Sequence, residues 1–390
     1  MIKACLIGVS GYGNTHYQML LEQHRLGMLQ LIGAAIINQK EEEEKCTNLQ
    51  KIGCQLFEDY AEMHIALKDE ANLCLIPTGT PLHKVMTISA LEANMHVLVE
   101  KPAAGCIEDV QLMHKAAQKA NRIVAVGYQH LYSTSALATK DAILNKTIGT
   151  IKSLKCLVTW PRSHQYYQRN HWAGKLNINA TQVNDSPINN AVAHELMMML
   201  FLAGLTKSTA ATPVVVESQL YRANAIESAD SACLRVETKE GIPISFYATH
   251  ACLENFGPEI HIEGSEGSIT MTHKEIVIQP NSKDNITLKV EDEHVNLITS
   301  MLDVIHQKPA FICDLTCASK QSMVISAVHE NALIQNVTSE TLHSEGKPSK
   351  THIPGIESAM REAFMKNKLL DTTIVPWAID SKHSECIRIH

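Results

Sequence analysis

The sequence lacks the features of a secreted, disulfide-bonded or membrane-spanning protein. Its 11 cysteines are scattered and none forms a CxxC pair, so neither a zinc ribbon nor a disulfide framework is indicated. The most apolar stretch, Met197 to Leu205, is about nine residues, roughly half of the ~20 that span a bilayer. The start, MIKACLIGVSGYG, has no secretory signal pattern. We expect a cytoplasmic protein with reduced, mostly buried cysteines and no membrane partner.

A strong net charge is also missing. The formal charge is -7 over 390 residues, and 45% of the residues are hydrophobic. Such a chain has no overall field to draw it onto nucleic acid, and it has enough apolar material for a sizeable core. We therefore expect a globular protein without a nucleic-acid partner. Its length exceeds the ~100 to 200 residues that one core organises, which predicts two domains.

The first 130 residues alternate short β-branched runs with amphipathic stretches, in the order of βαβ units. The predicted strands are nearly continuous apolar runs, typical of a parallel sheet covered on both faces. Helices are clearest over Leu82 to Ala93 and Glu108 to Ala120. The acidic run Glu41 to Glu44 is interpreted as the solvated start of another helix. The five predicted strands are Ile2 to Val9, Gln30 to Ile37, Leu73 to Thr78, His96 to Glu100 and Ile123 to Tyr128.

The pattern changes after Tyr132, where strands follow one another with few helices between them. This favours an open, largely antiparallel sheet. We predict an α/β protein, with a doubly wound parallel sheet in residues 1–130 and an α/β domain with an open, mostly antiparallel sheet in 131–390. The polar stretch Ser339 to Lys350 is expected to be a mobile loop. The strands are Ser153 to Thr159, Val214 to Leu220, Cys233 to Thr238, Ile244 to Thr249 and His261 to Glu263, and the helices are Asn189 to Leu202, Asn296 to Ile305, Ala318 to Ile334 and Gly355 to Lys366.

A glycine-rich turn follows the first strand and precedes a helix that begins near Thr15. Its small residues let the backbone approach a pyrophosphate, and the helix N-terminus supplies amide donors and positive potential. A tight turn that binds nothing is the alternative, because the middle glycine of the G-x-G-x-x-G pattern is a serine here. The candidate cofactor residues are Gly8, Ser10, Gly11, Tyr12, Gly13 and Asn14.

No acidic residue stands at the end of the second strand, where one would bind the adenosine ribose. Asn38 occupies that place and Lys40 follows it. An uncharged Asn38 tolerates a 2'-phosphate, and Lys40 could pair with one. The sequence therefore leaves NAD and NADP equally open as cofactors.

Two further segments end predicted strands of the same sheet. IPTGTPLH ends the third strand, so Thr78, Gly79 and His83 are candidates for the crevice where doubly wound sheets bind ligands. An ordinary strand-to-helix turn is the alternative. Glu100-Lys101-Pro102 ends the fourth strand, where Lys101 could stabilise negative charge on a substrate oxygen as hydride leaves carbon. The alternative is a surface lysine.

These segments, in this order, resemble the glucose-fructose oxidoreductase/inositol dehydrogenase (Gfo/Idh/MocA) family. GVSGYG, IPTGTPLH, ALEANMHVLVEKP and VGYQ are similar to its N-terminal domain, and ENFGPEIHIEGSEGSI to its C-terminal sheet. The resemblance implies a Rossmann domain that binds NAD or NADP, with Glu100 and Tyr128 at the cofactor site. It places Lys101 beside the nicotinamide and assigns acid/base chemistry to His194. It also implies a homodimer or homotetramer packed through the C-terminal sheet.

His194 lies in the segment DSPINNAVAH. Pro187 suits the first turn of a helix, on which Asn190 and His194, four residues apart, would share a face, and Asn190 would orient the imidazole. An imidazole is suited to accepting a hydroxyl proton at neutral pH. The sequence departs from the family here, because many members carry Asp where Asn190 stands. A structural histidine is the alternative; HELMM is not H-E-x-x-H, and no metal site is predicted.

Aromatic and arginine residues alternate in the loop that leaves the first strand of the second domain. Aromatic rings stack on sugars, while arginine binds hydroxyls or a carboxylate. A subunit interface and a nucleic-acid surface are the alternatives. The candidate substrate residues are Trp160, Arg162, Tyr167, Arg169, Trp172 and Asp185.

Together these observations predict hydride transfer between NAD(P) and a secondary alcohol of a sugar, cyclic polyol or derivative. Lys101 would steady the reacting oxygen and His194 would take its proton. Two alternatives stay open at this point. Tightly bound NAD could serve redox-assisted elimination or glycoside hydrolysis, or the fold could be a non-catalytic sensor of sugars or nicotinamides.

Overall fold

The computed structural model describes residues 1–290, 294–337, 342–346, 348–372, 375–378 and 385–389. It divides into two compact units. The first contains Met1–Tyr132 and the described residues of Asp292–Ser319, and the second contains the described residues of Ser133–Glu291 and Lys320–His390. The sequence predicts one domain over all of 131–390. In the structure, helix α9 (His294–Ile305) instead contacts α1 (Gly13–Arg25) and η1 (Gln129–Tyr132) of the first unit.

The first unit contains a six-stranded sheet with the order β3-β2-β1-β4-β5-β6, in which every pair of neighbours is parallel. The predicted doubly wound sheet is confirmed. All five predicted strands are present, and β3 was missed because a three-residue edge strand has no measurable periodicity. The strands are β1 (Ile2–Ile7), β2 (Leu29–Ala35), β3 (Gln55–Phe57), β4 (Leu73–Ile76), β5 (His96–Glu100) and β6 (Val124–Gly127).

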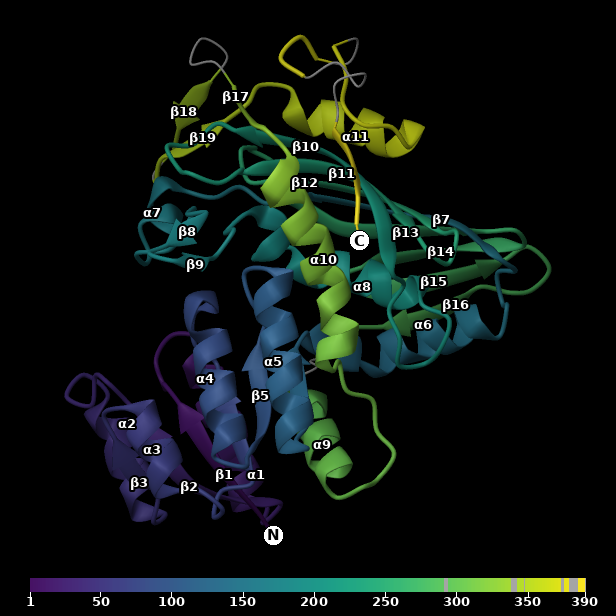
Figure 1. Ribbon diagram of the computed structural model, residues 1–390. Coiled ribbons are helices and arrows are strands. Elements are labelled where there is room, and N and C mark those ends of the chain that lie inside the picture. Colours follow the sequence, from purple (N-terminus) through teal and green to yellow (C-terminus); the bar gives the residue numbers. More distant parts are fainter. Residues whose placement is uncertain (291–293, 338–341, 347, 373–374, 379–384, 390) are drawn as a thin grey trace. The chain divides into compact units, whose positions relative to one another are not determined.

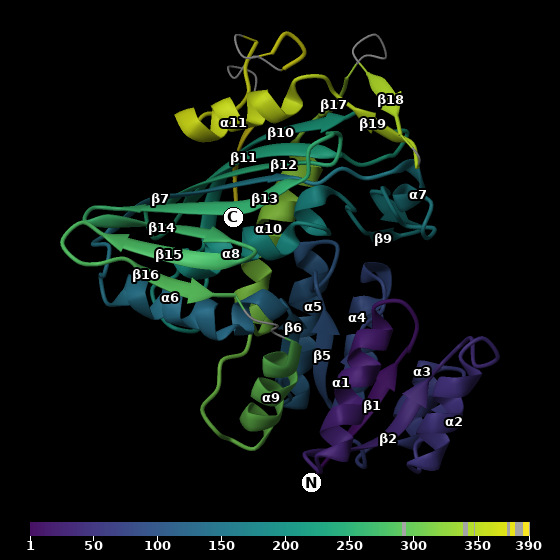
Figure 2. The ribbon, with the colours of Figure 1, turned by 180° about the vertical axis from the view of Figure 1, so that it is seen from behind.

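Helices cover both faces of this sheet. On one face α4 (Thr80–Glu92) packs against α5 (Ile107–Ala120), and α1 lies on the other (Figures 1 and 2). Both faces of the strands are thus removed from water, which explains their continuous apolar runs. Two shorter helices, α2 (Glu43–Lys51) and α3 (Tyr60–Ala66), join the strands at the β3 edge. The predicted helical start at the acidic run is confirmed, since Glu43 and Glu44 form the first turn of α2.

The second unit contains a ten-stranded sheet that is mostly antiparallel, as predicted. Only β7 with β12 and β10 with β17 pair in parallel among the described strands. Along the sheet the order is β16-β15-β14-β13-β7-β12-β11-β10-β17, and β20 also pairs with β10. The strands are β7 (Ile151–Thr159), β10 (Pro213–Arg222), β11 (Ser231–Thr238), β12 (Pro243–Thr249), β13 (Phe256–Gly264), β14 (Gly267–Thr272), β15 (Glu275–Pro280), β16 (Ile286–Lys289), β17 (Ile334–Asn336) and β20 (Glu385–Arg388).

Helices of the second unit cover both faces of its central strands. The helix α8 (Ala193–Ala203), buried along its whole length, packs against β7, β12 and β13. On the opposite face α11 (Ile356–Lys366) packs against β7 and β12 (Figures 1 and 2). There Met360 and Phe364 join a buried cluster with Leu157 and Tyr247 of the sheet. The remaining helices are α6 (Thr134–Leu144), α7 (His164–Tyr167) and α10 (Leu315–Asn331).

The stretch predicted as a mobile loop, Ser339 to Lys350, falls partly outside the described residues. Its described part contains β18 (His343–Glu345), which pairs with β19 (Lys350–His352) in a short antiparallel hairpin. The loop prediction is therefore wrong for these residues. Cross-strand bonding of two three-residue strands supplies the order that a polar composition does not reveal.

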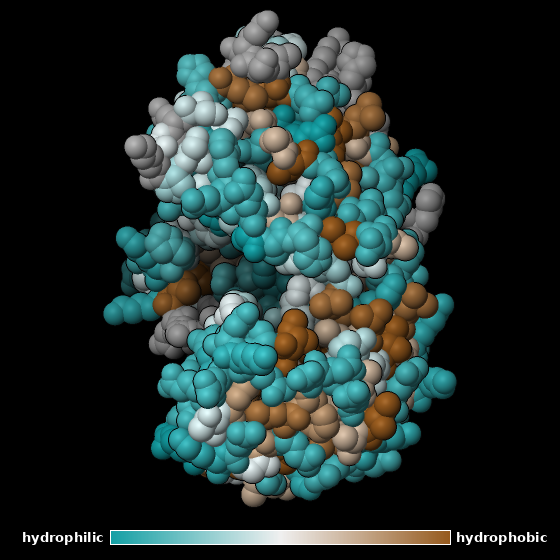
Figure 3. Space-filling view, turned by 90° about the vertical axis from the view of Figure 1, so that its left-hand side faces the viewer, coloured by the Kyte–Doolittle hydropathy of each residue, from teal (hydrophilic) through white to brown (hydrophobic). Residues whose placement is uncertain are grey.

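Most of the cysteines lie in the interior, and the apolar residues that reach the surface are scattered over it. Ten of the eleven cysteines are buried, and all eleven are free, as expected. Among the described helices, none combines the length and the apolar character that a bilayer crossing requires. Hydrophobic residues lie in small groups between hydrophilic ones on the face shown in Figure 3. Such scattered exposure is ordinary for a folded protein and identifies no partner surface.

Candidate active site

Three predicted ligand segments lie at the same edge of the first sheet. The strands β1, β4 and β5 are neighbours and parallel, so their carboxyl ends share that edge. Gly8 to Gly13 follows β1, Thr78 and Gly79 follow β4, and Lys101 follows β5. Ligands of doubly wound sheets bind beyond these ends. The fold therefore brings the glycine turn and the lysine to the edge at which a dinucleotide binds.

The turn after β1 requires glycine at several positions. Gly8 and Gly11 have φ angles of +85° and +55°, in the left-handed region that other residues rarely adopt. A Cβ at Gly13 would lie 2.8 Å from the carbonyl oxygen of Gly8. Because α1 starts at Gly13, this compact turn places the backbone and the positive end of the helix dipole at the sheet edge. These are the features that a pyrophosphate needs.

Two carboxylates lie beside the glycine turn, although the sequence analysis found no acidic residue at the end of β2. The hydroxyl of Ser10 donates to Oε1 of Glu42 over 2.7 Å. The amide of Asn38 donates to Ser10 Oγ over 3.1 Å and to Oε2 of Glu41 over 3.0 Å. Lys45 pairs with Glu42 at 2.8 Å and donates to the carbonyl oxygen of Val9.

The chain supplies this acidity from the start of α2 and not from the strand end. Hydrogen bonds from Lys45 and then Ser10 lower the pKa of the Glu42 carboxyl, so this group is ionised at neutral pH. The acidic run was interpreted as the solvated start of a helix because acidic side chains favour that end of a helix, and its distance from Ser10 along the chain gave no sign of contact. The turn between β2 and α2 creates that contact.

His83, predicted to contact the cofactor, has a fully buried side chain. Its Nδ1 lies 2.8 Å from the carbonyl oxygen of Pro102, and its Nε2 lies 3.0 Å from that of Thr78. The imidazole therefore ties the turn after β4 to the turn after β5. The Lys101–Pro102 peptide bond between these turns is cis.

Glu100 turns its carboxylate into the first unit, where it is 4% exposed. Its Oε1 lies 2.8 Å from Nε2 of His16, and its Oε2 accepts from the backbone N–H of Lys101 over 3.2 Å. Glu100 thus fixes the backbone of Lys101. His16, on α1, was missed because nothing near it in the sequence marks a partner 84 residues away. Tyr128, which follows β6, is likewise fully buried.

Replacing Gly127 with alanine is expected to disturb Glu100. The new Cβ would lie 2.5 Å from Glu100 Oε1. Because this carboxylate is buried and bonded to His16, it cannot simply rotate away, and overpacking of this kind costs about 1–3 kcal/mol. Chemical denaturation should show that loss in unfolding free energy. An unfolding free energy of Gly127→Ala within about 0.5 kcal/mol of the wild type would contradict the proposed crowding.

In the second unit, the helix that carries His194 begins later than predicted. It starts at Ala193 and not at Asn189, and Pro187 lies in a separate 3-10 turn, η2 (Pro187–Asn189). Asn190 has φ −129° and ψ −85°, which is not helical. The expectation that Asn190 and His194 share a helical face is therefore wrong. His194 occupies the first turn of α8 and is 7% exposed.

Side-chain hydrogen bonds explain the late start of α8. Asn189 donates to the carbonyl oxygen of Val183, and Asn190 Nδ2 donates to Oδ1 of Asp185 over 2.7 Å. Gln321 of α10 donates to the carbonyl oxygen of Ile188. Such bonds compete with helical ones and favour a turn.

A second contact from α10 holds the same turn, between Nε2 of His329 and Oγ of Ser186 at 2.9 Å. Burial lowers the pKa of His329 to about 4, so its ring is neutral at pH 7. Local sequence could not identify Gln321 or His329 as partners of this turn.

The predicted substrate residues of the second unit gather around Tyr166. The guanidinium of Arg169 lies 3.8 Å from the centre of the Tyr166 ring and 5.3 Å from that of Trp172. Arg162 lies 4.9 Å from the Tyr166 ring and 5.8 Å from that of Trp160.

Asp185 connects this cluster to the turn that precedes His194. Its carboxylate lies 3.6 Å from the guanidinium of Arg169. It also accepts from Asn190 and, over 2.6 Å, from the backbone N–H of Gly174. Tyr167 adjoins the same carboxylate in the lining of a small cavity.

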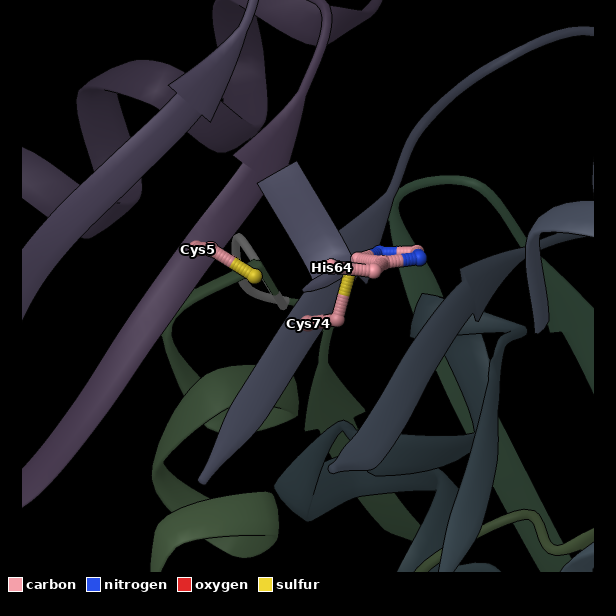
Figure 4. A group of neighbouring side chains, drawn as sticks. All are labelled: Cys5, His64 and Cys74. Atoms are coloured by element: carbon pink, nitrogen blue, oxygen red, sulfur yellow. The ribbon is translucent and has the colours of Figure 1, made fainter. Parts of the chain in front are cut away.

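One group of potential metal ligands is present among the described residues. Cys5, His64 and Cys74 are buried, and their ligand atoms lie within 4.8 Å of one another (Figure 4). Burial raises the pKa of the Cys74 thiol and lowers that of His64 to about 4, so both are uncharged at pH 7. His64 also contacts Ser89 Oγ at 2.9 Å and Cys74 Sγ at 3.4 Å. These contacts account for the group as core packing; the absence of a metal stays a prediction.

Curated relatives match parts of the chain. It is 22% identical over 198 residues to inositol 2-dehydrogenase/D-chiro-inositol 3-dehydrogenase of Halalkalibacterium halodurans, covering 50% of this chain and 51% of that protein. It is 27% identical over 155 residues to glucose-6-phosphate 3-dehydrogenase of Bacillus subtilis, covering 40% and 41%. The chain thus spans about half the length, or less, of these relatives.

Solved structures share the fold over most of the chain. The WlbA dehydrogenase from Chromobacterium violaceum, in complex with NADH and UDP-GlcNAcA, has a TM-score of 0.70 at 21% identity and covers 85% of this chain and 93% of its own. Levoglucosan dehydrogenase with NADH and levoglucosan has a TM-score of 0.70 at 16% identity, with coverages of 85% and 96%.

Two family models match the chain in succession and together cover more than half of it. Residues 2–128 match the oxidoreductase family with an NAD-binding Rossmann fold, and residues 136–270 match the GFO/IDH/MocA C-terminal domain. The resemblance found in the sequence motifs is thereby confirmed, and the chain belongs to the Gfo/Idh/MocA family of NAD(P)-dependent oxidoreductases.

Proposed function

We propose that the chain is a dehydrogenase that transfers hydride between NAD and a secondary alcohol of a sugar, cyclic polyol or derivative. One observation carries the proposal: the glycine turn after β1 and Lys101 after β5 lie at the same edge of one parallel sheet. The glycine turn fits a pyrophosphate, because a Cβ at Gly13 would meet the backbone of Gly8. The bound nicotinamide supplies the hydride chemistry.

The proposed roles of the protein's own groups follow from charge. Lys101 holds the substrate hydroxyl and stabilises the negative charge that grows on its oxygen. His194 accepts the hydroxyl proton. Asn190, whose amide nitrogen is bonded to Asp185, would orient the imidazole. The family resemblance implies an acid where Asn190 stands, and Asp185 places a negative charge one hydrogen bond away from that position.

We propose NAD in preference to NADP as the cofactor. Glu42 accepts a hydrogen bond from Ser10, and Glu41 accepts one from Asn38. Both carboxylates therefore lie on the side of the glycine turn where the adenosine ribose binds in this fold. Carboxylates there accept hydrogen bonds from ribose hydroxyls and repel a 2'-phosphate. Lys45, which could attract that phosphate, is paired with Glu42.

Replacing Glu42 with glutamine is expected to shift the cofactor preference toward NADP. The change removes one repulsive charge and releases Lys45 from its partner. We expect the ratio of kcat/KM for NADP over NAD to rise about tenfold, which corresponds to ~1.4 kcal/mol. Steady-state kinetics at constant ionic strength measure this ratio. The matched control is Glu43→Gln, an exposed neighbour on the same helix; an unchanged ratio in Glu42→Gln would contradict the assignment.

Mass spectrometry of small molecules released from freshly purified protein tests the proposed activity. A panel of sugars, polyols and sugar acids should follow, read at the reduced-nicotinamide absorbance. Free exchange of NAD with turnover of a polyol or sugar supports the proposal. Cofactor that copurifies and is never released favours elimination or hydrolysis instead, and sugar binding without any reaction favours a sensor.

The homodimer or homotetramer stays a prediction, as does the cytoplasmic location. For an oligomer packed through the C-terminal sheet, α11 restricts the available surface. It covers one face of β7 and β12, and α8 covers the other. We therefore place the interface on the part of the sheet formed by β13 to β16. Light scattering coupled to gel filtration measures the subunit number.

A further inference from the structure

Arg162 is held in place by the strands of the second unit. Three residues after β7 ends, its backbone N–H donates to the carbonyl oxygen of His250 over 3.2 Å. Trp160 is fixed in the same way, by its backbone N–H on Thr249 and by its indole N–H on the carbonyl oxygen of Gly257. The guanidinium of Arg162 rests against the rings of Trp160 and Tyr166. These contacts limit the positions that this cation can take.

This guanidinium lacks a counter-ion among the residues that the structure describes. Within the part of the chain that the structure describes, no carboxylate lies within 4.0 Å of Arg162, and its buried Nε has no hydrogen-bond acceptor. Arg169, which shares the Tyr166 ring with it, is paired with Asp185. Arg162 is half-buried, and a guanidinium nitrogen buried without an acceptor costs free energy that a ligand anion would offset.

The acidic groups nearby are engaged by other donors. Asp185 accepts from Gly174, Asn190 and Arg169. Asp230, which is fully buried, accepts from the backbone N–H groups of Ala223 and Asn224 and from two side chains. Neither carboxylate forms an ion pair with Arg162.

A third acid, Glu357, and the imidazole of His250 lie in the same region of the second unit. Glu357 accepts from the backbone N–H groups of Leu253 and Glu254. Burial, followed by the charge of Arg162, lowers the pKa of His250 to about 3, so His250 is neutral at pH 7. Among the described residues, none of these acids forms an ion pair with Arg162.

A second donor adjoins the same ring. Tyr167 contacts Tyr166 edge to face, with ring centres 5.2 Å apart. Its buried hydroxyl has no hydrogen-bond partner within the described residues. Tyr167 also lines a cavity of about 700 Å³ together with His164, Gln168 and Asn224. A cation and a phenol with free donor capacity favour a ligand group that only accepts hydrogen bonds.

We propose that the substrate carries an anionic group, a carboxylate or a phosphate, that Arg162 binds. The inference rests on the proposed function, because it names the class of substrate for the same reaction. The planar guanidinium binds such groups through paired N–H donors, and a neutral polyol offers no charge to compensate it.

One matched trio and one matched pair of ligands test this inference. Glucose, glucuronate and glucose 6-phosphate share a ring and differ in the charge at one carbon, and the myo-inositol and inositol phosphate pair adds a cyclic polyol. With the full chain and NAD, we expect kcat/KM to be about 10- to 100-fold higher for one anionic member than for its neutral counterpart, as charged hydrogen bonds of ~1.5–3 kcal/mol imply. The two anionic arms distinguish a carboxylate from a phosphate.

Arg162→Gln should abolish this preference, because the lost charge lowers kcat/KM for the anionic member far more than for the neutral one. Arg361→Gln, at a partly exposed arginine of α11, is the matched control and should keep the preference. Equal use of neutral and anionic members, or an anionic preference that survives Arg162→Gln, would overturn the inference.

A binding measurement decides the case in which no member of the panel reacts. Titration of inorganic phosphate and acetate into the wild type should raise its melting temperature more than in Arg162→Gln, and this readout needs neither NAD nor turnover. Equal responses of the two proteins would overturn the inference. Failure of the wild type to bind NADH would instead reject the proposed function, whatever the anions do.

Discussion

Lys101→Met is expected to lower kcat/KM by about a thousandfold on the substrate that the panel identifies, as loss of one group that stabilises a developing oxyanion does. Methionine keeps the length of the side chain but has no charge. The ammonium acts on the substrate oxygen, so NADH affinity should stay within about threefold. Steady-state kinetics and a fluorescence titration with NADH measure the two quantities on the same preparation.

Matched variants separate this effect from a general disturbance of the first unit. Lys119→Met, at an exposed position of α5, removes the same charge away from the sheet edge and should leave kcat/KM unchanged. Lys101→Arg should rescue little, because a planar fork does not replace a compact ammonium. Activity of Lys101→Met within threefold of the wild type would remove Lys101 from the mechanism.

His194→Gln is expected to lower kcat for alcohol oxidation by about 10²- to 10⁴-fold, the usual contribution of a general base. Glutamine retains hydrogen-bonding capacity at the first turn of α8 but cannot take the proton. In the wild type kcat/KM should rise with pH as the imidazole loses its proton and becomes able to accept another. The variant should lack that limb of the profile, and pH-dependent kinetics in the oxidation direction measure both effects.

Asn190 provides the matched comparison for His194. Asn190→Ala removes the group proposed to orient the imidazole and should lower kcat by a smaller factor, about tenfold, with the pH limb retained. A positioning residue is expected to behave in this way, and a merely structural one would lower stability without a selective loss of kcat. A pH limb that persists in His194→Gln would show that another group accepts the proton.

The cofactor edge could be predicted because the signals for it are local. The strand β5 runs from His96 to Glu100, as the apolar run indicated. Once β1, β4 and β5 are identified, parallel pairing alone places Gly8 to Gly13 and Lys101 at one edge. Short-range patterns of hydrophobic residues and turn residues thus determine most of the first unit.

Contacts between distant segments could not be predicted. Glu42 reaches Ser10 only through the path of the β2–α2 turn, and His16 reaches Glu100 across the sheet edge. Helix α9 belongs to the first unit although it follows β16 of the second sheet, and hydrophobic periodicity does not indicate which unit a helix joins. The start of α8 depends on hydrogen bonds from Asn190 and from Gln321 of α10. The local sequence around His194 does not show these bonds, and it therefore predicted a longer helix than the structure contains.

Titration of NADH into the purified full chain tests the central claim, that the turns after β1, β4 and β5 form a nicotinamide dinucleotide site. Fluorescence of the reduced nicotinamide is the readout. The account predicts a saturable change with one site per chain. If the fluorescence neither shifts nor quenches up to millimolar protein and cofactor, the sheet edge is not a dinucleotide site and the proposed chemistry fails with it.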